Sequence, residues 1–329
     1  MTGSSRPRFV LAAFAAVCLL AVGATAVLAP GAIGAVWDGA VPSQGAVETP
    51  DGSSAGPSAS PTPATGANES GTAESNETPA NGSYRYTAGE GATALSVTVV
   101  EAERPGPTVV VVGGQHGNEQ SGYRSAHRIE NWDVERGTLV VIPEANPRAI
   151  ANGTRKVEGR DLNAQFPVGE RPTSEQARVV WGVVERHDAD VVVDLHSSSG
   201  IYGVDGGVGQ AVFPTVTGPA KGNAEAATRR VNDEFGLTGN HSFKRGNVMG
   251  RSGMSLTRKV AGDLNESAYV VETTKRGTDL EIRVEWTTAV TWELLRLHGL
   301  VEGERPSADS PSNQRPPTSQ ARPSVSVAR

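Results

Sequence analysis

Two segments of the sequence each place a histidine where a buried strand is predicted to end. In GGQHGNEQ (residues 113–120), His116 and Glu119 lie three residues apart in a glycine-rich turn, and in VVVDLHSSSG (191–200) an apolar run leads into His196. A lone His-x-x-Glu pair is weak evidence, but the second histidine argues against coincidence, since sites in α/β sheets gather at the carboxyl ends of strands. Two imidazoles and a carboxylate suit a catalytic zinc ion with an open fourth position. His116, Glu119 and His196 are therefore candidate ligands of one metal ion.

Charged residues outside this triad could supply the remaining chemistry of a hydrolase. Glu272 follows the apolar run AYVV, and a half-buried carboxylate there can take a proton from water and deliver it to a leaving amine. The polar loop 145–167 carries three candidate arginines: Arg148, Arg155 and Arg160. A fixed guanidinium can stabilise an oxyanion or clamp a carboxylate. Taken alone, each of these residues is more often a solvated surface group.

Strand and helix signals alternate between residues 84 and 303, which predicts an α/β fold with a mostly parallel mixed sheet flanked by helices. Strands are expected from residue 94 and at 107–114, 138–144, 190–196 and 268–274, with the continuously apolar 107–114 at the centre. Helices are expected over 119–132, 173–187, 223–236 and 279–298. Thr173 is a candidate N-cap for the second helix.

The order of these motifs resembles the succinylglutamate desuccinylase/aspartoacylase branch of the zinc carboxypeptidase-like superfamily. GGxHGNE is followed by NPxA and an arginine, then DLN, DLH and a strand-end glutamate, spanning residues 113–272. The resemblance implies zinc bound by the two histidines and the first glutamate. It also implies Glu272 as the general base, Arg155 as the group that polarises the scissile carbonyl, and Asn163 as a residue lining the substrate site.

One position departs from the family pattern. Ala164 follows Asn163, where the family usually has an arginine that grips a carboxylate of the substrate. If the substrate carries that carboxylate, another arginine must hold it. The candidates are Arg148, Arg160 and Arg245.

The two ends of the chain differ in composition from the middle. Residues 1–8 form a basic stretch before the uncharged residues 9–29, which predicts a transmembrane anchor, or a cleaved signal segment, with everything later outside the membrane. Residues 30–83 are expected to form a disordered stalk rich in Ser, Thr, Pro and Gly, and 304–329 a disordered tail. The hydrolase domain is expected at 84–303.

Composition excludes several other classes of site. The formal net charge of -6 and the lack of a basic stripe argue against nucleic-acid binding. The only cysteine is Cys18, so the globular part has neither an internal disulfide nor a thiolate zinc site.

These observations predict a zinc-dependent amide hydrolase that deacylates N-acyl amino acids or related amides with metal-activated water. Two alternatives stay open. One is a metallocarboxypeptidase that acts outside the membrane on peptides or cell-wall stems, and the other is a catalytically silent zinc-binding surface module. The expected partners are a small acylated amino acid or peptide and, through the N-terminal segment, the membrane.

Overall fold

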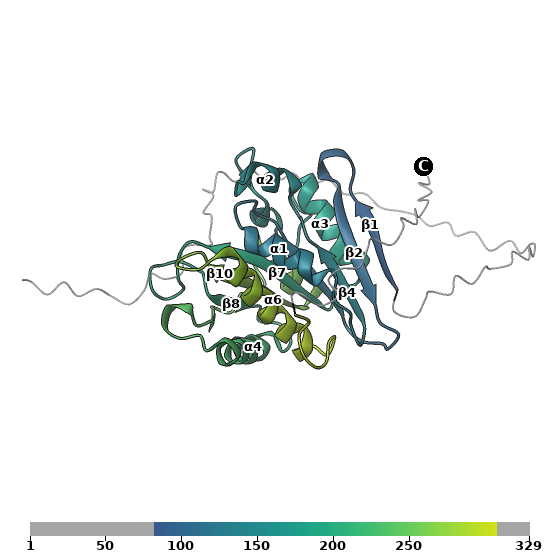
Figure 1. Cartoon of the computed structure of the whole chain (residues 1–329). Helices are drawn as coiled ribbons and strands as arrows, with labels where there is room; N and C mark the ends of the chain where they lie inside the picture. Colours follow the sequence, from purple (N-terminus) through teal and green to yellow (C-terminus); the bar gives the residue numbers. More distant parts are fainter. Residues whose placement is uncertain (1–81, 308–329) are drawn as a thin grey trace, which may run out of the picture. The chain divides into compact units, whose positions relative to one another are not determined.

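The computed structural model describes residues 82–307, which are built around an eight-stranded mixed sheet (Figure 1). The strand order is β1-β2-β4-β3-β7-β10-β8-β9. These strands are β1 (Ser83–Ala88), β2 (Leu95–Glu101), β3 (Thr108–Gly113), β4 (Thr138–Ile142), β7 (Val191–Ser198), β8 (Ala211–Pro214), β9 (Lys244–Arg245) and β10 (Ser267–Thr274). The four central strands β4, β3, β7 and β10 run parallel. The predicted α/β fold with a mostly parallel mixed sheet is confirmed.

Helices cover both faces of this sheet, because successive side chains of a strand point to opposite faces. The longer helices are α1 (Gln120–Ile129), α3 (Glu175–Arg186), α4 (Ala220–Phe235) and α6 (Leu280–Leu297). In β3, Val109 and Val111 pack in one buried cluster with α1, α4 and α6. Val110 and Val112 pack on the other face with α3 and the short helix α5 (Leu256–Lys259). Figure 1 shows α4 and α6 side by side, away from β1 and β2.

The segment predicted as a plain polar loop, 145–167, has more structure than its composition indicates. It contains helix α2 (Pro147–Asn152), the two-stranded hairpin β5 (Lys156–Val157) and β6 (Arg160–Asp161), and the 3-10 turn η2 (Leu162–Gln165). Asn146 begins α2 by accepting a hydrogen bond from the Ala149 amide, with Pro147 at the first helical position. The remaining short segments are η1 (Gly91–Thr93), η3 (Gly239–His241) and the π-helical η4 (Val260–Leu264).

One predicted helix cap is wrong by a residue. Ser174, not Thr173, caps α3, because its backbone is extended and its hydroxyl accepts a hydrogen bond of 3.1 Å from the Ala177 amide.

No helix within residues 82–307 is long and apolar enough to cross a membrane. The predicted basic stretch 1–8, the anchor or signal segment 9–29, nearly all of the stalk at 30–83 and most of the tail at 304–329 lie outside the described residues. Membrane attachment and a location outside the membrane therefore stay predictions from the sequence.

Candidate metal centre and active site

The turn after β3 directs His116 and Glu119 toward one point at the carboxyl end of the sheet. Gly114 has a φ of 73°, in the left-handed region that favours glycine. Gly117 passes so close to α2 that a methyl group on it would collide with the Ala149 carbonyl. Glu119 then stands at the N-cap of α1. The glycines of GGQHGNEQ thus make the turn tight enough for both side chains to meet.

His196 reaches the same point from β7, which lies between β3 and β10. His116, Glu119 and His196 are 1%, 4% and 1% exposed. Nδ1 of His116 lies 2.9 Å from Oε1 of Glu119, and Nδ1 of His196 lies 2.8 Å from its Oε2. The two Nδ1 atoms are 3.2 Å apart. Two nitrogens bound to a tetrahedral zinc at about 2.0–2.1 Å would be about 3.3 Å apart, so this spacing fits a shared ion.

The electrostatics of the cluster also fit a cation. Burial alone would lower the pKa of both imidazoles, but Asp161 and Glu119 raise the pKa of His116. Asp194 and Glu119 likewise raise the pKa of His196 well above its ordinary value. Burial favours the neutral acid of Glu119, yet the two imidazoles hold its pKa well below the usual range. The carboxylates therefore favour positive charge at the imidazoles, and a metal bound at Nδ1 would supply that charge in place of the Nδ1 protons.

The far nitrogen of each imidazole faces a carboxylate. Nε2 of His116 lies 2.8 Å from Oδ1 of Asp161, within hydrogen-bond geometry. Nε2 of His196 lies 3.0 Å from Oδ2 of Asp194, an ion-pair distance without the alignment of a hydrogen bond. Asp194 is fully buried and accepts a 2.6 Å hydrogen bond from Gln115. Carboxylates in these positions fix the ring orientation that leaves Nδ1 available for a metal.

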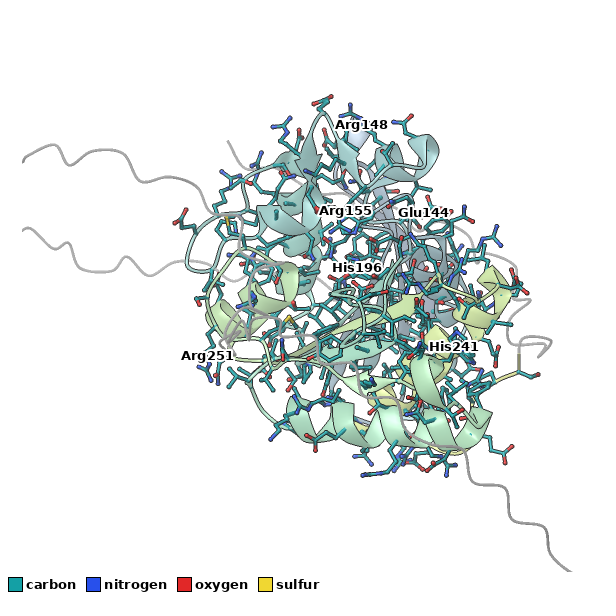
Figure 2. The ribbon with its side chains drawn as sticks, turned by 90° about the vertical axis from the view of Figure 1, so that its left-hand side faces the viewer. Glu144, Arg148, Arg155, His196, His241 and Arg251 are labelled. Carbon is teal, nitrogen blue, oxygen red and sulfur yellow. The ribbon has the colours of Figure 1, made fainter. Side chains whose placement is uncertain are left out.

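Asp161 was missed by the sequence analysis. It begins the DLN motif, but nothing in the spacing shows that the β5–β6 hairpin turns its carboxylate back onto His116. Arg155 links Asp161 to Glu119. Its Nε donates to Oδ2 of Asp161 at 2.9 Å, and its Nη1 donates to Oε1 of Glu119 at 2.8 Å. The Arg155 side chain is 42% exposed. In the view of Figure 2, Arg155 lies between His196 and the more peripheral Arg148.

Glu272 lies beside His196, because the parallel register of β10 and β7 pairs these two residues. Glu272 is 3% exposed, and its Oε2 has no hydrogen-bond partner among the described residues. Burial, and then the negative charge of Glu119, raises the pKa of Glu272 to about 8. A divalent cation in the cluster would favour the ionised form. A buried, unpartnered carboxylate next to the three potential ligands therefore also fits a site that holds a cation and water.

The residues predicted to bind substrate are not all brought to the cluster. Asn163 is buried, and its Oδ1 accepts from the first amide of α5 while its Nδ2 has no partner among residues 82–307. Arg148 and Arg160 both pair with Glu158, at 2.5 and 3.2 Å, and are 49% and 65% exposed. Arg245 pairs with a glutamate of α4. Asn163 is thus bound to the start of α5, and the three arginines are paired with glutamates instead.

Comparison with known proteins agrees with this architecture and these motifs. The mixed sheet with helices on both faces resembles a carboxypeptidase-like α/β fold. A structural match is the cell-shape determinant Csd4 of Helicobacter pylori solved with a tripeptide, with a TM-score of 0.55 and 19% identity, covering 66% of this chain and 58% of that chain. At this identity the likeness shows the fold alone.

Part of the sequence matches a known family. Residues 105–203 match the succinylglutamate desuccinylase/aspartoacylase catalytic domain, in agreement with the resemblance that the motifs indicated. The N-alpha-acetyl-L-2,4-diaminobutyric acid deacetylase of Halomonas elongata is 34% identical over 119 residues, or 32% of this chain and 33% of that protein. Aspartoacylase of Rattus norvegicus is 32% identical over 123 residues, or 32% of this chain and 39% of that protein. The chain thus matches well under half the length of both relatives.

Proposed function

We propose that this protein is a zinc-dependent amide hydrolase that deacylates N-acyl amino acids or related amides. The observation that carries the proposal is the buried cluster of His116, Glu119 and His196 with the unpartnered carboxylate of Glu272 beside it. Two imidazoles and a carboxylate form the donor set of many catalytic zinc sites. The family match and the two curated relatives, named as a deacetylase and an aspartoacylase, support amide chemistry.

Zinc held by the three ligands would act as a Lewis acid and acidify a water molecule. The protein supplies the remaining groups. Glu272 takes a proton from the attacking water and passes it to the leaving amine, since it is the carboxylate at the cluster that no described residue engages. Arg155 donates to Glu119 and Asp161 through Nη1 and Nε, and its Nη2 has no partner within residues 82–307. That free N–H stabilises negative charge on the carbonyl oxygen of the substrate.

Replacement of Glu272 by Gln tests this assignment. The amide keeps the size of the side chain but cannot accept the proton, so we expect kcat to fall by about 10²–10⁴-fold, in line with the usual contribution of a general base. Zinc content, measured by elemental analysis, should be unchanged because Glu272 is not a ligand. Activity close to that of the unaltered protein would remove Glu272 from this role.

The substrate panel should contain N-acyl amino acids and peptides with a free carboxyl terminus, assayed with the full chain. Preference for the acyl amino acids supports the deacylase, whereas preference for the peptides supports the alternative of a carboxypeptidase. Bound zinc with no turnover of any member would indicate a silent binding module and contradict the proposal.

A further inference from the structure

Lys275 lies beside the segment that carries Glu119 and has no role in the zinc mechanism described above. It directly follows β10, three residues after Glu272. Its Nζ donates a 2.9 Å hydrogen bond to the carbonyl of Asn118, the residue that precedes the ligand Glu119. Its backbone amide donates to the carbonyl of Ser198 at the end of β7. Lys275 therefore touches the ends of the two segments that deliver the three metal ligands.

The charge of Lys275 is not neutralised within the protein. No carboxylate of residues 82–307 lies within ion-pair distance of its Nζ, and within these residues the hydrogen-bond partner of Nζ is the neutral Asn118 carbonyl. An ammonium group has three N–H donors, so two of them stay available. Glu119 and Glu272 act on Lys275 only from a distance. A cation that gives up water without gaining an acidic partner is unfavourable.

Two arginines act on Lys275 alongside Glu119 and Glu272. Arg283, in the first turn of α6, and Arg155 both act on Lys275 as like charges. Arg283 donates to the Thr278 carbonyl, forms no ion pair within the described residues, and has a buried Nε without a partner. Burial, above all, lowers the pKa of Lys275. An anion bound beside Lys275 would relieve both the repulsion and the missing contacts.

Two other cations, Arg155 and Arg276, already have acidic partners. Arg155 is held by Glu119 and Asp161. Arg276, the neighbour of Lys275, pairs with Asp205 at 2.5 Å. Within the described part of the chain, Lys275 is thus a partly buried cation without an acidic partner, and no other such cation lies nearer in sequence to the base Glu272.

We propose that Lys275 binds a carboxylate of the substrate and so directs the site toward amides that carry an anionic group close to the scissile bond. This inference rests on the proposed amide hydrolysis and names its substrate class. With Arg155 at the acyl carbonyl, the free N–H groups of Lys275 hold the carboxylate of the amino-acid part on the side of Asn118.

The test compares Lys275→Met with the unaltered full chain on two matched substrates. One is the best N-acetyl amino acid of the panel and the other is its neutral N-methylamide. Loss of a hydrogen bond between charged groups should raise KM for the carboxylate substrate about 10–100-fold, with kcat and the N-methylamide constants changed less than about twofold. Lys275→Arg should retain the preference, because it keeps the charge.

Lys221→Met removes the same charge from an exposed position on α4 and should leave all constants unchanged. Calorimetric binding of the free amino-acid product provides a readout independent of turnover, and Lys275→Met should weaken it by a similar factor. Equal effects of Lys275→Met on both substrates, or none on either, would overturn the role of Lys275 while leaving amide hydrolysis intact. If the zinc-loaded unaltered protein cleaves no amide, the proposed function and this inference fail together.

Discussion

The replacement Asp161→Asn tests how strongly the hairpin controls the metal centre. Asp161 accepts hydrogen bonds from His116 and Arg155 through different oxygens, and from the Asn163 amide through the oxygen that also meets His116. An asparagine has one carbonyl oxygen, so it can serve His116 or Arg155 but not both. The other donor would then face an NH₂ group.

The expected loss of zinc affinity follows from the loss of one of these hydrogen bonds. One charge-assisted hydrogen bond contributes about 1.5–3 kcal/mol, which corresponds to roughly a 10–150-fold change in an equilibrium constant. Carboxylates that orient metal-bound histidines typically contribute about 10–100-fold to metal affinity. We therefore expect Asp161→Asn to weaken zinc binding by about 10–100-fold while the fold is kept, since Asp161 lies in a short surface hairpin.

A competition titration against a zinc chelator of known affinity measures this change. Asp190→Asn is the matched control, because Asp190 accepts a hydrogen bond from the Thr108 amide at the opposite end of β7. That variant should bind zinc as the unaltered protein does. Equal zinc affinities for Asp161→Asn and the unaltered protein would refute the argument that Asp161 orients His116.

Two further predictions concern the scaffold. Gly117→Ala should abolish zinc binding or folding, because the added methyl group would collide with the backbone of Ala149. Gly222→Ala, which has open space around it in α4, should raise the free energy of unfolding by about 0.5–1 kcal/mol. Thermal unfolding and zinc content distinguish the two variants, and normal zinc binding by Gly117→Ala would contradict the packing argument. Burial lowers the pKa of His298 to about 4, and its Nε2 lies 2.7 Å from the Tyr269 hydroxyl, within hydrogen-bond distance. Because the folded protein disfavours protonation of His298, the contribution of His298 to the free energy of unfolding is fully present above about pH 6.5. This contribution is lost as the pH falls toward 4, by up to about 3 kcal/mol. Denaturant titrations of the unaltered protein and His298→Gln should show this loss only in the former, and parallel pH profiles would contradict it.

Much of the fold could be predicted because its signals are local. The continuous run of valines in β3 marks a strand buried on both faces, and α6 and β10 occur where periodicity and apolar content placed them. The short strand β8 and helix α2 were not predicted. Four residues of AVFP, or the six of α2, carry too little periodicity to distinguish them from a loop.

The residues of the candidate site that closely follow apolar strands could be predicted. Those whose contacts depend on the path of a hairpin or a turn could not. The apolar runs before His196 and Glu272 indicated two strand ends, and the structure pairs the two residues in register on neighbouring strands. Asp161 and Lys275 could not be placed, because their partners are set by the path of a hairpin and a turn. For the same reason, the sequence could not show that Arg148 and Arg160 share Glu158.

Metal analysis of the full chain tests the central claim most directly. We predict one zinc per chain, loss of that zinc in His116→Ala, and hydrolysis that disappears with a chelator and returns when zinc is restored. Zinc retained in full by His116→Ala, or hydrolysis that continues after the metal has been removed, would contradict the account.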